Sequence, residues 1–160
     1  MLKVLIVYDS VFGNTEQIAQ AISDSLGSKE NVETLRVNDV KIEKITGLDL
    51  LIVGSPTRGF RPTQAITNFL KRISTKGLNG VRVAAFDTRF LLSSIESSAL
   101  RFMVKTGGYA ARSIANRLKK KGAYLVMPPE GFLVTSEKGP LQEGELERAA
   151  DWAKIAIKEQ

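Results

Sequence analysis

Short apolar runs alternate along this chain with segments in which apolar residues return every three or four positions. The runs, together with one alternating segment, predict five strands at residues 2–8, 32–37, 48–53, 81–86 and 124–127. The periodic segments predict four helices at residues 14–26, 63–73, 109–121 and about 143–157. Regular alternation of strand and helix requires parallel strands joined by right-handed crossovers. We therefore predict a single α/β domain over residues 1–160, built as a three-layer, doubly wound, five-stranded parallel sheet.

The segment 91–107 interrupts this pattern after the fourth predicted strand. It is too long for an ordinary connection between two elements. Ile95, Ala99 and Phe102 recur at roughly helical spacing, which favours an additional helix. The alternative interpretation is a lid over a site.

The turn after the first predicted strand has the residues of a phosphate cradle. Its sequence is Ser10-Val11-Phe12-Gly13-Asn14-Thr15, and a helical segment begins within it. Backbone N–H groups, the hydroxyls of Ser10 and Thr15, and the positive end of the helix dipole would all favour an anion, and Gly13 lets the backbone approach closely. Neither a dinucleotide fingerprint nor a triphosphate loop is present, so a monophosphate fits best. The other interpretation is that Asn14 or Thr15 only caps the helix.

Composition narrows the possible chemistry. The chain contains neither cysteine nor histidine, which excludes Ser-His-Asp and Cys-His catalysis and most zinc or haem ligation. Chemistry beyond simple acid–base work would therefore come from a bound cofactor. The net charge of +6 favours acidic partners, although the cluster at residues 119–121 lies at a helix end, where it suits the dipole and makes nucleic acid an unlikely partner. We predict no membrane span and no cleaved leader, and therefore a cytoplasmic protein.

Three predicted loops together carry a family resemblance. They are the turn described above, Gly54-Ser55-Pro56-Thr57-Arg58-Gly59 after the third strand, and Phe86-Asp87-Thr88-Arg89-Phe90 at the fourth. With these loops the chain resembles the flavodoxins over nearly its whole length, and in particular their short-chain branch. The resemblance implies the strand order 2-1-3-4-5 and FMN as cofactor at the switch point of the sheet, since flavodoxin is itself the standard example of that rule.

The resemblance also assigns cofactor-binding residues from each loop. For the phosphate it implies Ser10, Phe12, Gly13, Asn14 and Thr15. For one face of the flavin ring it implies Pro56, Thr57, Arg58, Gly59 and Phe60. For the pyrimidine edge and an outer aromatic contact it implies Asp87, Thr88, Arg89 and Phe90, with Tyr109 as a second candidate for the aromatic.

Several of these positions depart from the family pattern or are central to it. Phe12 stands where the family usually has serine or threonine, and the lost hydroxyl would cost roughly 1.5–3 kcal/mol of affinity unless another donor compensates. The alternative interpretation of Phe12 is an apolar plug. Gly59 matches the glycine whose peptide turns over on reduction, which requires the positive φ that glycine adopts readily. Arg58 stands where an aromatic or apolar residue often stacks on the flavin, so either its guanidinium or the ring of Phe60 would provide that contact.

Arginines replace the carboxylates that usually surround the flavin in this family. Arg58, Arg61 and Arg89 would stabilise an anionic reduced flavin, which implies a less negative reduction potential. Alternatively they bind the phosphates of NADPH or an acidic substrate, or they are solvated rim charges. The leading function is thus an FMN electron carrier serving redox partner proteins. The alternatives are an FMN-dependent NAD(P)H:quinone reductase and a flavodoxin-like regulatory or nucleotide-binding module without flavin.

Overall fold

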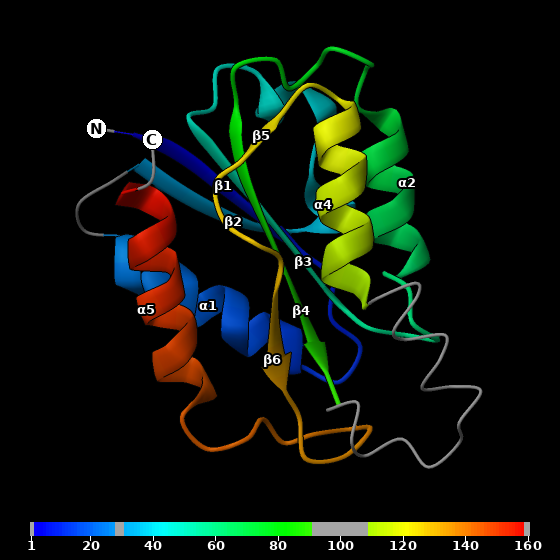
Figure 1. The fold of residues 1–160 in the computed structure, drawn as a ribbon, viewed down its shortest axis with the longest axis vertical. Helices are drawn as coiled ribbons and strands as arrows, with labels where there is room; N and C mark the ends of the chain where they lie inside the picture. The colour runs from blue at the N-terminus through cyan, green and yellow to red at the C-terminus, as the bar shows by residue number, and fades with distance from the viewer. Residues whose placement is uncertain (1, 28–30, 91–108, 159–160) are drawn as a thin grey trace.

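A twisted parallel sheet runs through the middle of the molecule (Figure 1). The computed structural model describes residues 2–27, 31–90 and 109–158. Its strands are β1 (Lys3–Tyr8), β2 (Asn31–Arg36), β3 (Leu50–Pro56), β4 (Arg82–Arg89), β5 (Tyr124–Leu125) and β6 (Glu130–Leu133). They are arranged in the order β2-β1-β3-β4-β5, and all described strand pairs are parallel. The predicted α/β fold and the order 2-1-3-4-5 are confirmed.

Helices cover both faces of the sheet. On one face lie α1 (Asn14–Leu26) and α5 (Glu145–Lys158), and on the other lie α2 (Gln64–Arg72) and α4 (Ala110–Lys120), as Figure 1 shows. Two short 3₁₀ helices, η1 (Val37–Asp39) and η2 (Ile42–Ile45), connect β2 to β3. The helix boundaries agree with the sequence pattern to within two residues.

The middle positions of the central strands are apolar without interruption because both of their faces are covered. In β3, Leu51 and Val53 pack on the α2/α4 side, whereas Leu50 and Ile52 pack on the α1/α5 side. All four are completely buried. Successive side chains of such a strand enter the two cores in turn, so its sequence is a continuous apolar run, as it is at residues 50–53.

The fifth strand differs from the prediction. A strand was expected over residues 124–127, but β5 ends at Leu125 and a second segment, β6, resumes pairing with β4 further along the same edge. Pro128 and Pro129 separate the two segments. Because proline has no N–H, this pair interrupts the ladder without ending the strand direction.

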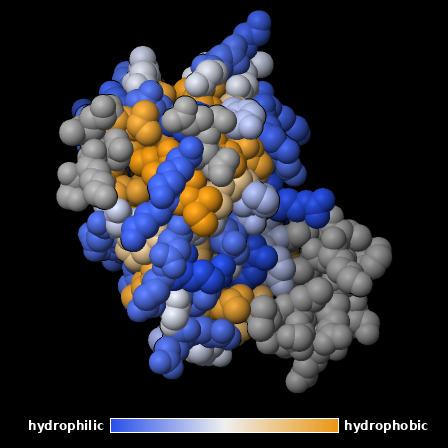
Figure 2. Space-filling view, turned by 60° about the vertical axis from the view of Figure 1, so that its left-hand side comes forward, coloured by the Kyte–Doolittle hydropathy of each residue, from blue (hydrophilic) through white to orange (hydrophobic). Residues whose placement is uncertain are grey.

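The predicted helix or lid at residues 91–107 lies outside the described residues. Within the described ranges, no helix has the length and apolar character needed to cross a bilayer. The surface on the α5 side mixes apolar and polar areas, as Figure 2 shows. In α5, the large exposed apolar residues are Leu146 and Ile155.

Candidate functional site

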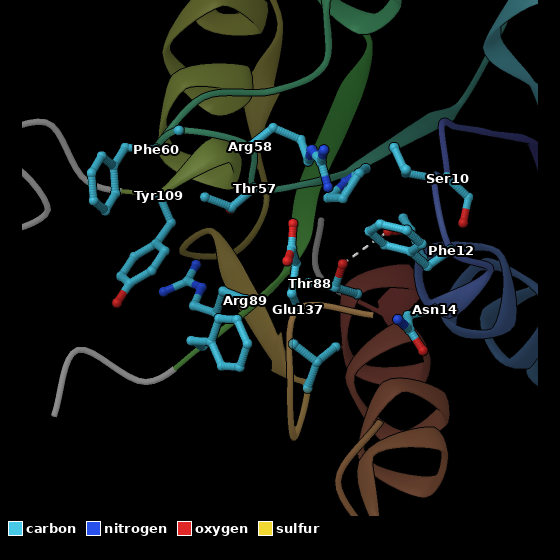
Figure 3. A pocket seen from close by; sticks show the side chains of 16 residues that line it. Ser10, Phe12, Asn14, Thr57, Arg58, Phe60, Thr88, Arg89, Tyr109 and Glu137 are labelled. Carbon is cyan, nitrogen blue, oxygen red and sulfur yellow. Dashed lines mark hydrogen bonds between the residues drawn. The ribbon is translucent and has the colours of Figure 1, made fainter. Parts of the chain in front are cut away.

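A pocket of about 270 Å³ opens where the carboxyl ends of the strands meet (Figure 3). Four chain segments that follow β1, β3, β4 and β6 supply its walls, together with the start of α4. Its lining residues are Ser10, Val11, Phe12, Asn14, Thr15, Pro56, Thr57, Arg58, Gly59, Phe60, Thr88, Arg89, Phe90, Tyr109, Val134 and Glu137. Crevices at this edge of a doubly wound sheet are where such folds bind ligands.

The turn between β1 and α1 presents unused backbone donors to the pocket. Gly13 has a φ of 92°, and the Ser10 Oγ accepts hydrogen bonds from the N–H of Gly13 (3.1 Å) and of Glu16 (3.3 Å). The hydroxyl proton of Ser10 therefore remains available to donate. Within the described part of the chain, the N–H groups of the buried residues Asn14 and Thr15 have no acceptor. Free donors at a helix N-terminus form a site for an anion.

A buried hydroxyl pair joins this turn to β4. The Oγ1 atoms of Thr15 and Thr88 lie 2.9 Å apart. Only one of the two hydroxyls can donate within the pair, so the other proton is free for a ligand. The loop after β6 also reaches the turn, because the side-chain amide of Asn14 donates to the carbonyl of Lys138 at 3.2 Å.

The loop after β3 folds into a tight two-residue hairpin. Arg58 and Arg61 exchange backbone hydrogen bonds of 2.8 and 3.0 Å, and the two central residues, Gly59 and Phe60, have φ values of 55° and 66°. Positive φ at both central positions is the type I′ geometry. Glycine adopts it freely, whereas Phe60 carries a cost of about 1–2 kcal/mol. The backbone freedom expected at Gly59 is thus in use, and its role in reduction stays a prediction.

Phe12 lies at the mouth of the pocket and is not a buried plug, since it is 40% exposed. The guanidinium carbon of Arg58 lies 5.4 Å from the centre of its ring, and the Lys138 ammonium lies 6.0 Å from it. Both distances are within cation–π range. Phe12 therefore brings together the loops that follow β3 and β6.

Arg89 is held as one member of a neutral pair. Its guanidinium donates to both carboxylate oxygens of Asp87, at 2.7 and 2.9 Å, and stacks 4.0 Å from the centre of the Tyr109 ring. A Cβ at Gly131 would fall 2.0 Å from the Arg89 Nε, so the guanidinium lies against bare backbone. The pair cancels most of the positive charge that the sequence attributes to Arg89.

Asp87 is fully buried and stands behind the pocket wall. Besides Arg89, it accepts from the N–H of Ala111 at 2.8 Å, at the start of α4, and it is hydrogen-bonded to the Thr57 side chain. Burial raises the pKa of Asp87, against the lowering effect of Arg89 and the two other donors. Thr57 in turn accepts from the N–H of Ala110 at 3.2 Å. These two strand-end residues cap α4, whose N-cap residue Tyr109 provides no side-chain cap.

Tyr109 brings a polar atom to the pocket wall. Its hydroxyl is buried and has no hydrogen-bond partner among the residues that the structure describes. Burial raises its pKa, with Arg89 acting in the opposite direction, so the phenol is neutral at physiological pH. Tyr109 and Phe90, the two candidates for an outer aromatic contact, both line the pocket.

The structure brings most of the predicted site residues together. Twelve of the fourteen line the pocket, and the two others, Gly13 and Asp87, lie directly behind lining residues and position them. Sequence reasoning missed Val11, Val134 and Glu137. The signal for the last two was the apolar segment after Pro128-Pro129, which continues the fifth strand and so delivers its loop to the same edge.

Comparison with curated proteins gives partial matches. The chain is 35% identical over 89 residues to a probable flavodoxin 1 from Bacillus subtilis, covering 54% of this chain and 56% of that protein. It is 37% identical over 84 residues to a flavodoxin from Clostridium beijerinckii, covering 51% of this chain and 60% of that one. The matched stretches thus span less than two thirds of these relatives.

Solved structures and a family model match all or most of the chain. Oxidised flavodoxin 2 from Bacillus cereus superposes with a TM-score of 0.77 at 24% identity, covering 99% of both chains. Flavodoxin 1 from the same organism gives 0.76 at 17% identity, again over 99% of both chains; at these identities the likeness establishes the fold. A family model described as Flavodoxin matches residues 6–152. Because that match spans most of the sequence, this chain belongs to the flavodoxin family.

Proposed function

We propose that this protein binds FMN in the pocket and carries electrons between redox proteins. The observation that supports this most is the pairing of two unlike surfaces in one cavity. An anion site with free N–H groups at Asn14 and Thr15 adjoins walls that carry Phe12, Phe60 and Tyr109. A molecule with one phosphate at the end of a flat aromatic body matches both surfaces.

Each part of the pocket has a distinct task in this proposal. Ser10 and the N–H groups of Asn14 and Thr15 hold the phosphate, and one hydroxyl of the Thr15–Thr88 pair donates beside it. The aromatic residues exclude water from the ring. When bound, FMN supplies reversible electron transfer, and the chain has no cysteine from which a thiol–disulfide couple could supply it instead.

Charge at the pocket sets the expected reduction potential. Asp87 neutralises Arg89, so Arg58 and Glu137 are the lining residues whose charges are left to oppose one another. Arg58 would favour a negatively charged reduced cofactor, and Glu137 would oppose it. We expect Arg58→Gln to make the potential more negative and Glu137→Gln to make it less negative, both measured by spectroelectrochemical titration. Equal shifts in one direction would contradict this assignment.

The test of the binding site compares FMN with riboflavin, which lacks the phosphate. The wild type should bind FMN more tightly, as measured by quenching of flavin fluorescence. Ser10→Ala should weaken FMN binding by roughly 10- to 150-fold, the equivalent of one hydrogen bond to a charged group, and leave riboflavin binding nearly unchanged. The control is Ser74→Ala, at an exposed position after α2. Failure of the wild type to bind FMN would overturn the proposal.

A second assay separates a carrier from an enzyme of the same fold. The FMN-loaded protein is incubated with NADPH and a soluble quinone, and NADPH consumption is followed by absorbance. A carrier shows no sustained turnover, because it exchanges electrons with protein partners at an exposed flavin edge. Steady turnover that depends on bound FMN would instead identify an NADPH:quinone reductase.

A further inference from the structure

The layer formed by α2 and α4 carries positive charge alone. Residues 57–81 and 109–123 contain no aspartate or glutamate. The ten basic residues in these two ranges are Arg58, Arg61, Lys71, Arg72, Lys76, Arg112, Arg117, Lys119, Lys120 and Lys121. None of them forms an ion pair with a carboxylate in the described ranges. Their charge is therefore not neutralised within the layer and is available to a partner.

Two adjoining hollows on the outer surface of the layer are lined by six of these ten residues, namely Arg58, Arg61, Lys71, Arg117, Lys120 and Lys121. One has a volume of about 880 Å³ and the other about 620 Å³. Lys71, Ser113 and Arg117 line both, so the hollows are continuous. We call this surface, from Arg58 and Arg61 at one end to Lys120 and Lys121 at the other, the basic strip. The eleven residues of α4 give it a length of roughly 16 Å.

The basic strip begins at the rim of the candidate cofactor pocket. Arg58, Gly59 and Phe60 line the pocket and also line the larger hollow. In Figure 3, Arg58 and Phe60 lie along the upper edge of the pocket, on the side of the α2/α4 layer. A protein bound on the strip would therefore contact the edge of the cofactor site.

We propose that the basic strip docks a redox protein whose own surface is rich in carboxylates around its redox centre. This inference rests on the proposed function. Complementary charge would steer the two proteins together and orient them, so the partner's redox centre would face the rim at Arg58 and Phe60. One electron then passes from the reduced partner to the bound FMN; the partner loses it and the FMN gains it.

The composition of the strip favours an acidic protein over a nucleic acid. Proteins that hold single strands use a series of aromatic platforms on which successive bases stack. On the strip, Phe60 lies at the pocket rim, but along the two helices Phe69 of α2 is fully buried and α4 contains no aromatic residue. A phosphate backbone would also gain nothing from the contact with the cofactor pocket. Double-stranded DNA is nevertheless included in the test as a competitor.

The experiment measures electron transfer by stopped flow from a reduced [2Fe–2S] ferredoxin of negative net charge to the FMN-loaded protein. The rate constant should fall as ionic strength rises, because salt screens an attraction. With a c-type cytochrome of positive net charge as acceptor for the reduced protein, the rate constant should rise instead. The opposite pair of salt dependences, or none, would overturn the proposal.

Matched charge reversals locate the surface. Lys71→Glu/Lys120→Glu alters two exposed lysines of the strip, whereas Lys154→Glu/Lys158→Glu alters two exposed lysines of α5 on the other face. Both variants change the net charge equally. The strip variant should lose about 10-fold or more of the low-salt rate constant, Lys71→Gln/Lys120→Gln should lose less, and the α5 variant should stay within about 3-fold. Equal losses in the strip and α5 variants would refute a localised docking surface.

Two further measurements distinguish this inference from the proposed function. FMN titration of each variant shows whether the cofactor site is intact. Calorimetric titration of the FMN-free chain with the ferredoxin then tests docking alone, and binding should be lost in the strip variant and kept in the α5 variant. If FMN fails to bind, the proposed function fails; if FMN binds but the ferredoxin does not, the docking proposal fails. Displacement of the ferredoxin by a DNA duplex at physiological salt would assign the strip to nucleic acid.

Discussion

The two helical layers have similar inner faces and opposite outer faces. Both pack apolar residues against the sheet, in two separate cores. On the outside, α2 and α4 carry six basic and no acidic residues, whereas α1 and α5 carry five acidic and three basic ones. Packing constrains the inner face of a helix but leaves its exposed charges free to vary. The charge difference between the layers is therefore not imposed by packing, and we place the proposed redox partner on the positively charged α2/α4 side.

The layers also differ in the ion pair that attaches each one to the sheet. Asp87 in β4 is completely buried and holds Arg89 and the start of α4. Glu145 at the start of α5 accepts from Arg148 and from the N–H of Leu133, and the Arg148 side chain is 40% exposed. Burial dominates at Asp87 and raises its pKa, whereas the hydrogen bond from Arg148 dominates at Glu145 and lowers its pKa.

Removing the buried carboxylate of Asp87 should have the largest effect on the free energy of unfolding. Asp87→Ala leaves Arg89 and the Ala111 N–H without their acceptor, and we expect a loss of about 3–5 kcal/mol in the free energy of unfolding. Glu145→Ala should cost less, about 1–2 kcal/mol, because water can solvate Arg148. Urea denaturation followed by circular dichroism measures both. Asp87→Ala/Arg89→Met should recover part of the loss; no recovery would mean that the unpaired arginine is not its cause.

A smaller loss of stability is expected when the space beside Arg89 is filled. In Gly131→Ala the new Cβ would lie about 2.0 Å from the Arg89 Nε, so the guanidinium must leave its place against Tyr109. Overpacking of this kind costs about 1–3 kcal/mol. The same substitution in an Arg89→Ala background should cost nearly nothing, which a double-mutant cycle measures. An unchanged cost in that background would show that Arg89 does not lie against Gly131.

The contributions of Glu145 and Asp87 to the free energy of unfolding should change with pH in opposite directions. The folded-state pKa of Glu145 lies below its ordinary value of 4.5. The stabilisation that ionised Glu145 gives to the folded state is therefore complete above pH 4.5 and is lost as the pH falls below that value. The stability difference between wild type and Glu145→Gln should therefore shrink on acidification below 4.5. The folded-state pKa of Asp87 lies above its ordinary value of 3.8, so the difference between wild type and Asp87→Asn should shrink as the pH rises above 3.8. Unfolding free energies of the wild type and both variants, measured from pH 3 to pH 7, test these two expectations. If both stability differences changed with pH in the same direction, the proposed contrast between Glu145 and Asp87 would be wrong.

The sequence predicts the parts of this molecule that depend on local pattern. The periodic helices and apolar strands appear where expected because both cores select the same residue types. The split fifth strand was missed because Pro128 and Pro129 resemble a strand end when read locally. Only the position of Glu130–Leu133 beside β4 reveals that the strand continues.

The site residues also divide into those that local sequence could place and those that depend on the position of a distant segment. Ser10 could be placed because it closely follows the first predicted strand, whereas Gly59 and Thr88 were placed by the resemblance of their loops to those of the family. Glu137 could not be placed, because its loop follows the strand segment that was missed. The pairing of Arg89 with Asp87 was also missed, because the fourth strand was predicted to end at residue 86. In the structure β4 continues to Arg89, and two residues that are two positions apart in a strand lie on the same face.

The smallest expected effect concerns the basic strip itself. Neutralising Lys71 and Lys120 with glutamine removes repulsion among neighbouring cations, but it also removes favourable charges from the last turns of α2 and α4. Because these contributions oppose one another at exposed positions, the free energy of unfolding should change by less than about 0.5 kcal/mol. Urea denaturation at low and high salt provides the measurement, and Lys154→Gln/Lys158→Gln on α5 is the matched control. A large loss of stability in the strip variant would mean that these lysines support the fold, and their charge could then no longer be assigned to a partner.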